Sequence, residues 1–304
     1  MLALPDVACD ERPAYRPYRA TVTGVRALSP SFARLTFTAP DFEFFAPHGL
    51  DQRIKLLFPL NGRLADVGAD GAWFDAWRAL PDELRNPMRT FTVRAVRAEQ
   101  REIDIDFVSH GDGGPAARWL ASAAPGAELV IVGPDVRSLT STGGIDWHPG
   151  SARELLLAGD ETAAPAICSI LESLPAGVRA RAFLSVPSAA DAVPLVSAAT
   201  VDVTWLGRDA GAEPIESAVR AWAAGNPAVY GPALSRSTQE LEEVDVDVDM
   251  IWDSPEDAPG EFYAWIAGES GMIKSLRRYL VSELGVDRTR VAFMGYWRLG
   301  KAEN

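Results

Sequence analysis

Short stretches of alternating polarity fill the first part of the chain. Apolar and acidic side chains alternate in residues 102–108 (Glu-Ile-Asp-Ile-Asp-Phe-Val), which predicts a strand with one buried face and one acidic face. Similar stretches, separated by turn residues, continue from Tyr18 to about Val132. They predict strands over residues 18–26, 32–38, 53–58, 90–96, 102–108 and 128–132, and one helix over residues 115–123. Six short strands with a single helix indicate a small antiparallel β-barrel.

The polarity pattern changes after residue 153. Residues 155–158 form an uninterrupted apolar run, which is typical of a parallel strand covered on both faces. Strands and helices alternate from there on, and this alternation predicts a doubly wound α/β domain. The expected strands are residues 155–158, 179–186, 201–206, 229–231, 261–267 and 291–295, and the expected helices follow residues 162, 217 and 270. In the last helix, Lys274, Arg277 and Arg278 are expected to face solvent.

Residues 135–151 are rich in turn-forming side chains and form the expected domain junction. We place a barrel domain at residues 15–137 and an α/β domain at residues 138–304. Residues 61–85, which hold two tryptophans, interrupt the barrel pattern and are expected to form a surface insertion.

The segment 240–261 is strongly acidic. Valine and aspartate alternate over residues 244–249, so every aspartate lies on one face of the predicted strand. Three carboxylates spaced along a strand do not converge on one ion, which favours a solvent-exposed edge strand over a calcium site.

Length, charge and cysteine content narrow the class of protein. The 304 residues fit two domains, and a formal net charge of −13 argues against nucleic acid or an anionic membrane as the main partner. No apolar run is long enough to span a membrane, and the first residues lack the features of a signal peptide. Cys9 and Cys168 belong to no metal-type cluster, and three scattered histidines do not indicate a metal site. We expect a monomer in a reducing cytoplasm.

Two motifs in the barrel region carry candidate chemistry. Residues 89–92 (Arg-Thr-Phe-Thr) have the composition of a β-strand with a cation at its head. Residues 110–116 (His-Gly-Asp-Gly-Gly-Pro-Ala) form a glycine-rich turn that opens a helix, where a phosphate can approach the backbone. Each motif alone is more often an ordinary strand or an ordinary turn. Together, an arginine, an aromatic ring, a hydroxyl and a phosphate-binding turn suit a flavin dinucleotide.

The first turn of the α/β domain departs from the usual dinucleotide fingerprint. Residues 159–165 (Gly-Asp-Glu-Thr-Ala-Ala-Pro) contain one glycine and two acids where Gly-x-Gly-x-x-Gly is usual. The alternative role of Asp160 and Glu161 is to stabilise the N-terminus of a helix. Arg208 follows a predicted strand, where it would contact a nucleotide 2′-phosphate or be an ordinary surface charge.

The chain resembles the siderophore-interacting protein family of FAD-dependent ferric-siderophore reductases, which is related to the ferredoxin reductases. The resemblance extends from about Tyr18 to the C-terminus and rests on several blocks in the family's order. The blocks are residues 54–59 (IKLLFP), 89–92 (RTFT), 106–108 (DFV), 110–111 (HG), 114–116 (GPA), 159–163 (GDETA), 265–269 (WIAGE) and 295–298 (GYWR). Phe91 stands where a tyrosine is more usual and keeps the ring. Ser185 replaces the glutamate of a Glu-Val-Pro motif, which changes the expected ribose contact.

The resemblance implies a role for each matched residue. Arg89 would pair with the FAD pyrophosphate, Phe91 would pack on the flavin, and Thr92 would hydrogen-bond near its N5. The turn from residue 110 to 116 would hold the phosphates, and Trp297, whose alternative role is plain core packing, would cap the pocket. The cofactor-binding candidates are Arg89, Thr90, Phe91, Thr92, Asp106, Val108, His110, Gly113, Gly114, Pro115, Ala116, Asp160, Thr162, Ala163 and Trp297.

The resemblance also implies the reaction. NADPH or NADH would reduce a non-covalent FAD, and single electrons would pass to Fe(III) held by a siderophore, without an obligatory acid or base from the protein. Basic residues near the flavin would attract the anionic chelate, and Lys55, Arg137 and Arg298 are the candidates. Lys55 has a second interpretation, as a strand lysine that extends its ammonium to solvent. The alternative functions are a general NAD(P)H:flavin or quinone reductase and a non-enzymatic carrier of the ferric siderophore.

Overall fold

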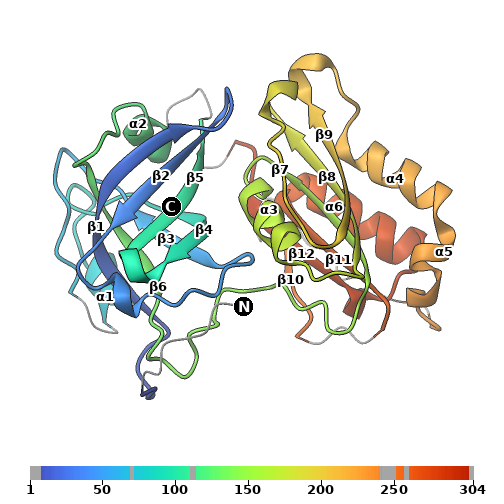
Figure 1. Ribbon diagram of the computed structural model, residues 1–304, viewed down its shortest axis with the longest axis horizontal. Coiled ribbons are helices and arrows are strands. Elements are labelled where there is room, and N and C mark those ends of the chain that lie inside the picture. The colour runs from blue at the N-terminus through green and yellow to red at the C-terminus, as the bar shows by residue number, and fades with distance from the viewer. Residues whose placement is uncertain are drawn as a thin grey trace. The chain divides into compact units, whose positions relative to one another are not determined.

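The computed structural model describes residues 8–68, 72–109, 114–237, 239, 241, 251–256 and 260–300 (Figure 1). The chain divides into two compact units between Ile145 and Asp146. Residues that follow the last barrel strand remain with the first unit because they are hydrogen-bonded to it. Tyr15 Oη and Gln52 Nε2 both donate to the carbonyl oxygen of Gly143, at 2.8 and 3.0 Å. Each unit has a hydrophobic core of its own.

The first unit is a closed antiparallel barrel, as the sequence pattern predicts. Its strands are β1 (Tyr15–Ala27), β2 (Phe32–Thr38), β3 (Arg53–Leu57), β4 (Met88–Arg97), β5 (Glu102–Val108) and β6 (Glu128–Pro134). Around the barrel they follow the order β1-β2-β5-β4-β3-β6 (Figure 1). Alternate side chains, such as Leu35 and Phe37 of β2, are fully buried in the interior. Helix α2 (Pro115–Leu120) contributes Trp119, whose ring stacks on that of Phe37 with the centroids 6.3 Å apart.

The insertion between β3 and β4 packs on the outside of the barrel. It contains the short helix α1 (Trp73–Arg78), from which Trp77 is only 7% exposed. Trp77 packs with Leu57 of β3 and with Val130 and Val132 of β6 in a small separate cluster. The insertion therefore covers apolar side chains on the outer face of β3 and β6 rather than lying loosely at the surface.

The second unit is a sheet of six strands in the order β10-β12-β11-β7-β8-β9. The strands are β7 (Glu154–Asp160), β8 (Arg179–Val186), β9 (Thr200–Gly207), β10 (Trp252–Asp253), β11 (Phe262–Glu269) and β12 (Val291–Trp297). All neighbouring pairs are parallel except β10 with β12. The run at residues 155–158 is buried throughout, as expected for a central parallel strand.

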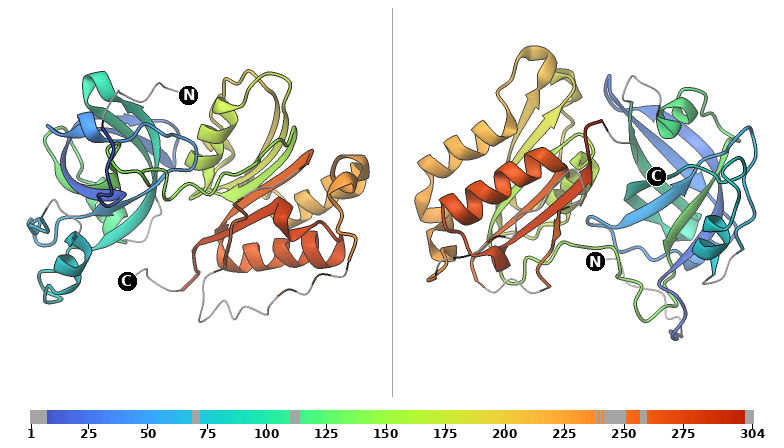
Figure 2. Two further views of the ribbon diagram at one scale, coloured as in Figure 1. Left: turned by 90° about the horizontal axis from the view of Figure 1, so that it is seen from below. Right: turned by 180° about the vertical axis from the view of Figure 1, so that it is seen from behind.

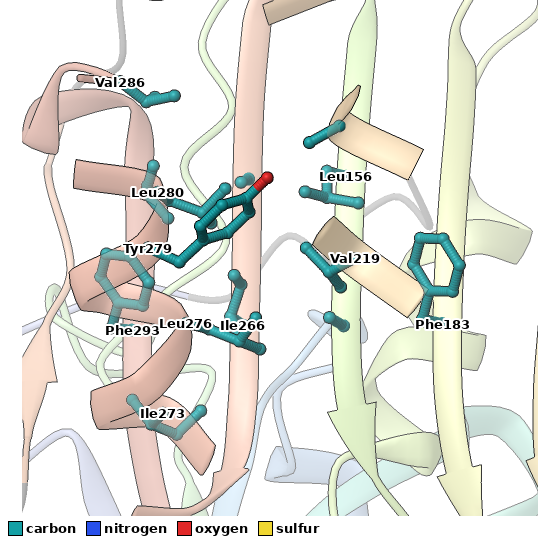
Figure 3. Packing of buried hydrophobic residues seen from close by; sticks show 14 of the residues in the cluster. Leu156, Phe183, Val219, Ile266, Ile273, Leu276, Tyr279, Leu280, Val286 and Phe293 are labelled. Carbon is teal, nitrogen blue, oxygen red and sulfur yellow. The ribbon is translucent and has the colours of Figure 1, made fainter. Parts of the chain in front are cut away.

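Helices cover both faces of this sheet. They are α3 (Ala164–Ser173), α4 (Ile215–Gly225), α5 (Pro227–Tyr230) and α6 (Ser270–Arg277), which continues as a π-helical stretch (Arg278–Glu283). Figure 2 shows α3 on one face, with α4 and α6 on the other. Figure 3 shows the core on the second face, where Leu276 of α6 and Val219 of α4 lie among side chains of the sheet such as Ile266.

Two local expectations are wrong. Residues 229–231 form no strand: α5 begins at Pro227, whose fixed φ suits the first position of a helix, and a 3₁₀ turn (Gly231–Ala233) follows. Arg277 does not face solvent but is 8% exposed, because its Nη2 lies 3.4 Å from the carboxylate of Asp253 on β10. The predicted acidic strand at residues 244–249 lies outside the described residues.

Candidate functional site

The pairing of β3 with β4 brings several candidate residues of the barrel together. Thr90 lies directly opposite Lys55, and Lys55 Nζ donates to Thr90 Oγ1 at 2.6 Å. Phe91 lies opposite Ile54, and Thr92 lies opposite Arg53. The Arg-Thr-Phe-Thr motif and the lysine therefore form one patch of two adjacent strands.

Arg89 and Phe91 are two positions apart in β4, so their side chains leave the strand on the same face. Phe91 is partly buried and packs on the interior cluster, with its ring centroid 4.6 Å from that of Phe107. Arg89 lies opposite the fully buried Leu56, and its Nη1 donates to the carbonyl oxygen of Met88 at 2.7 Å. The motif thus presents an anchored aromatic ring and a guanidinium on the same strand.

Two further candidates are engaged in ion pairs of the barrel. Both oxygens of Asp106 accept from Arg34, at 2.6 and 2.8 Å, and Arg94 Nε lies 3.6 Å from Oδ2. Arg137 donates from Nε and Nη2 to Asp135, at 2.8 and 2.6 Å, and its guanidinium lies 3.8 Å from the centroid of the Phe44 ring. Each side chain has a complete structural explanation, so a contact of Asp106 with the cofactor or of Arg137 with substrate stays a prediction.

The expected phosphate-binding turn is described in part. His110 and Gly113 lie outside the described residues, and Val108 ends β5 just before them. Gly114 is the extended residue before α2, and a Cβ added to it would meet no other atom within 4 Å. Pro115 is the first residue of α2, and Ala116 packs on the barrel core.

These residues fit a flavin dinucleotide. A partly buried ring that packs on the barrel core, a guanidinium two positions before it and an unobstructed glycine are the features that a flavin and a pyrophosphate need.

In the second unit, the strand order gives the position where open α/β sheets usually bind a ligand. The chain runs from β7 outward through β8 and β9, and β11 and β12 then add on the other side of β7. The order reverses between β7 and β11, and open α/β sheets bind ligands at the carboxyl ends of the strands beside such a reversal. Asp160 ends β7 and Glu269 ends β11, so both lie at this point.

The carboxylate of Asp160 joins three segments at the reversal. Oδ1 accepts from the N–H and the Oγ1 of Thr162, at 2.9 and 2.5 Å. Oδ2 accepts from the N–H of Glu269 at 2.8 Å and from Nε1 of Trp297 at 2.7 Å. Burial raises the pKa of Asp160, and the hydrogen bonds from Thr162 and Trp297 oppose that shift. The chain thereby fixes the orientation of Trp297 at the end of β12.

Neighbouring residues support this arrangement. A Cβ on Gly268 would lie 2.6 Å from Asp160 Oδ2, and the φ of +144° there also favours glycine. Glu269 caps α6 by accepting from the N–H groups of Gly271 and Met272, at 2.7 and 3.0 Å. Ala163 is fully buried, and Arg298 follows Trp297 directly.

Glu161 and Arg208, which follow the ends of β7 and β9, form an ion pair. Glu161 follows β7 and is 3% exposed, and its two oxygens accept from Nη1 and Nη2 of Arg208, both at 2.7 Å. Arg208 Nη1 also lies 3.3 Å from Oγ of Ser185, near the end of β8. Arg208 is therefore not an isolated surface charge.

The sequence does not reveal two of these connections. Asp160 and Trp297 are 137 positions apart, and Glu161 and Arg208 are 47 apart. Only the strand order brings such residues together. The sequence does carry a local signal for the contact between Asp160 and Thr162. An aspartate followed two residues later by threonine is typical of a turn in which the carboxylate accepts from the backbone N–H of the later residue.

Two features are absent from the part of the chain that the structure describes. None of its described helices is both long and apolar enough to cross a membrane. Among the same residues, no three His, Cys, Asp or Glu side chains are grouped to hold a metal ion.

Known proteins match both units. Residues 21–138 match the siderophore-interacting FAD-binding domain, and residues 152–300 match the siderophore-interacting protein family. The solved structure of the siderophore-interacting protein SipS from Aeromonas hydrophila is 32% identical, with a TM-score of 0.65 over 95% of this chain and 94% of that one. The chain belongs to the siderophore-interacting protein family.

Two other relatives add detail. The ferric vibriobactin reductase ViuB of Vibrio cholerae is 28% identical over 285 residues, which are 91% of this chain and 87% of that protein. A ferredoxin reductase of carbazole 1,9a-dioxygenase, 15% identical with a TM-score of 0.57 over 93% of this chain and 70% of that one, shares the fold alone. This member of the siderophore-interacting family thus has a ferredoxin reductase-like fold with an FAD-binding barrel domain.

Proposed function

We propose that the protein is an NAD(P)H-dependent, FAD-mediated ferric-siderophore reductase that releases Fe(II) in the cytoplasm. One observation carries the proposal: a siderophore-interacting FAD-binding barrel is followed in one chain by a sheet whose strand order reverses, which is where open α/β sheets usually bind ligands. The similarity to a ferric vibriobactin reductase supports the same reaction class.

In this proposal the residues of the chain bind and orient the reactants. Arg89 would hold the pyrophosphate of FAD by charge-assisted hydrogen bonds, and Phe91 would provide the apolar surface against the ring. Thr162 and Trp297 both donate hydrogen bonds to Asp160, and they would line the part of the site where NAD(P)H binds. Bound FAD would supply the conversion of one hydride from NAD(P)H into two single electrons, which reduce two ferric ions, and one proton, which is released to solvent.

Release of the iron follows from ligand chemistry. Hard oxygen donors such as catecholates and hydroxamates bind Fe(III) more tightly than Fe(II), so reduction loosens the complex. No proton has to be moved by a side chain in this scheme. Lys55, Arg137 and Arg298 would contribute positive charge that attracts the anionic chelate.

The test is steady-state consumption of NADPH and NADH by the FAD-loaded protein with a ferric siderophore, with Fe(II) captured by a ferrous chelator. The proposal expects consumption that depends on the ferric complex and two ferrous ions per nucleotide. Equal turnover without iron would identify a general flavin or quinone reductase. Binding of the complex without any turnover would identify a carrier.

A further inference from the structure

The guanidinium of Arg208 is held on one side by the buried Glu161 and the partly buried Ser185. Glu161, which is 3% exposed, takes up one N–H from each of Nη1 and Nη2, both at 2.7 Å. Ser185 Oγ lies 3.3 Å from Nη1 and occupies its second N–H. The Arg208 side chain is itself 49% exposed, so the guanidinium is fixed from below while part of it faces solvent.

A count of the N–H donors of Arg208 shows which of them can bind a ligand. A guanidinium has five N–H groups, and the contacts with Glu161 and Ser185 use three of them. The remaining two, on Nε and Nη2, are parallel and lie on the same edge of the planar group. They make no hydrogen bond within the described ranges of the chain. Such an edge matches two oxygens of a phosphate group.

The position of Arg208 in the sheet indicates which phosphate group of a nucleotide it would bind. Glu161, Ser185 and Arg208 all lie at the carboxyl ends of β7, β8 and β9, along the edge where a nucleotide binds in this kind of sheet. Sites for NAD usually place an acid near the ribose 2′-hydroxyl, whereas sites for NADP place an arginine near the 2′-phosphate. Here Ser185 is neutral and the exposed donor edge belongs to an arginine.

Besides Glu161 and Asp160, whose hydrogen bonds are described above, two further acids near Arg208 oppose an anion. Asp209 accepts from Oγ of Ser188 and from the N–H of Ala189, at 2.7 and 2.8 Å. Asp191 is fully buried and accepts from the N–H of Ser188 at 2.9 Å. Both carboxylates are thus turned toward the loop after β8. Their repulsion is weakened by solvent around the exposed edge, whereas two aligned charge-assisted bonds act directly on the phosphate.

We infer that the nucleotide bound by this chain carries a 2′-phosphate, held by Nε and Nη2 of Arg208, and that the electron donor is NADPH. Glu161 and Ser185 are the positioning residues for that guanidinium. The identity of the donor rests on the proposed function, whereas binding of an adenosine 2′-phosphate group does not.

The first test is calorimetric titration with adenosine 2′,5′-bisphosphate and with adenosine 5′-monophosphate. The wild type is expected to bind the bisphosphate at least about tenfold more tightly, since charge-assisted bonds to one phosphate give about ten- to a hundredfold in affinity. Arg208→Leu is expected to remove this preference and leave binding of the monophosphate unchanged. The matched control is Arg179→Leu, because Arg179 pairs with Glu154 between β8 and β7 at the opposite edge of the sheet.

Arg208→Leu leaves the buried Glu161 without its partner, so a second variant keeps the test decisive. Ser185→Glu retains the Arg208–Glu161 pair and adds an acid at the ribose position. It is expected to lower the ratio of kcat/KM for NADPH to that for NADH at least about tenfold. The inference is overturned if the wild type binds both adenosine phosphates equally, or if folded Arg208→Leu keeps the preference. If Arg208→Leu does not fold, an unchanged nucleotide ratio in Ser185→Glu overturns it. A protein that oxidises neither nucleotide refutes the proposed function, and the titrations still decide the phosphate site.

Discussion

At the scale of single residues, Arg89 carries the most direct prediction for the barrel. We predict that Arg89→Ala weakens FAD binding about ten- to a hundredfold, because a charge-assisted hydrogen bond to phosphate contributes roughly 1.5–3 kcal/mol. Fluorescence titration of the apoprotein with FAD measures the change, and circular dichroism reports whether the barrel remains folded. Arg19→Ala is a suitable control, since Arg19 is 61% exposed and pairs with Glu128 on the barrel surface. Equal FAD affinity in Arg89→Ala and the wild type would remove Arg89 from the site.

The same scale shows why single charges are hard to interpret from a sequence. The motif around Arg89 was predictable because strand composition and spacing are local properties. The partners of Asp106 and Arg137 were not, because an ion pair depends on which strands become neighbours. Arg34 and Asp106 meet 72 positions apart, and Arg137 lies against the ring of Phe44. The contacts that hold Asp106 and Arg137 therefore cannot be predicted from the spacing of residues along the chain.

At the scale of elements, the end of β11 gives a prediction of stability. We predict that Gly268→Ala destabilises the α/β unit by more than about 1 kcal/mol, because the new methyl group would collide with the Asp160 carboxylate at a φ of +144°. Urea unfolding followed by tryptophan fluorescence measures the effect. Gly225→Ala in α4 is the matched control, since a Cβ there meets nothing within 4 Å and alanine favours a helix. Equal destabilisation by the two changes would mean that contact with Asp160 is unimportant.

The outer face of the barrel strands gives a prediction of pH dependence. Burial opposes ionisation of Asp104, but hydrogen bonds from Arg97 and Thr36 outweigh it and lower its pKa below 3.8. The folded barrel therefore binds this proton more weakly than the unfolded chain. The stabilisation is complete well above pH 3.8 and is lost as the pH falls through the lowered pKa.

We accordingly expect the melting temperature of the barrel to fall below about pH 4, where the carboxylate of the unfolded chain becomes protonated. Asp104→Asn is expected to melt lower than the wild type at neutral pH and to lose less on acidification. Melting curves at a series of pH values measure both effects. Parallel pH dependence of Asp104→Asn and the wild type would exclude this contribution.

Elements themselves were predictable to different degrees. Long strands with clear periodicity were found within a few residues, and β5 and β8 have the expected bounds. The failure at residues 229–231 has a local cause, since Pro227 starts a helical turn just before an apolar tripeptide that is too short to show a period. The burial of Arg277 has a distant cause, because the carboxylate of Asp253 comes from another strand.

At the scale of the whole molecule, we predict that FAD is bound without a covalent link. Cys168 is buried in α3, and Cys9 Sγ donates to the carbonyl oxygen of Val136. Acid or heat should therefore release the yellow chromophore into the supernatant, where its mass identifies FAD. Added FAD should also stabilise the apoprotein, by about 2.7 kcal/mol at a hundred times the Kd. A precipitate that keeps the colour, or an apoprotein that FAD leaves unchanged, would contradict this prediction.

The net charge of −13 leads to a prediction about substrate. A protein this acidic repels an anionic chelate at long range, so local cations are needed where it binds. We predict that Lys55→Ala and Arg298→Ala slow electron transfer to the ferric chelate and leave reduction of FAD by NAD(P)H nearly unchanged. The effect should shrink for a neutral chelate and with added salt, because exposed charges are screened over about 10 Å at 0.1 M.

Stopped-flow measurement of the two half-reactions separates the possible outcomes. Lys274→Ala, which removes an exposed lysine from α6, controls for the loss of any positive charge. If reduction of FAD slows as much as the iron step, Lys55 and Arg298 serve the nucleotide or the fold instead.

The strand order around Asp160 has a consequence for synthesis on the ribosome. Thr162, the first donor to Asp160, is synthesised directly after β7. The other two donors, Glu269 and Trp297, come 109 and 137 positions after Asp160. Until then β7 is an edge strand of the partial sheet β7-β8-β9, although it is central in the finished one. Edge strands are open to pairing with other chains, and distant contacts form late because chain entropy must be lost first. When β11 pairs with β7, it covers an edge that is prone to aggregation. When β12 is added, Trp297 becomes the last donor to the Asp160 carboxylate, which would otherwise be buried with fewer partners.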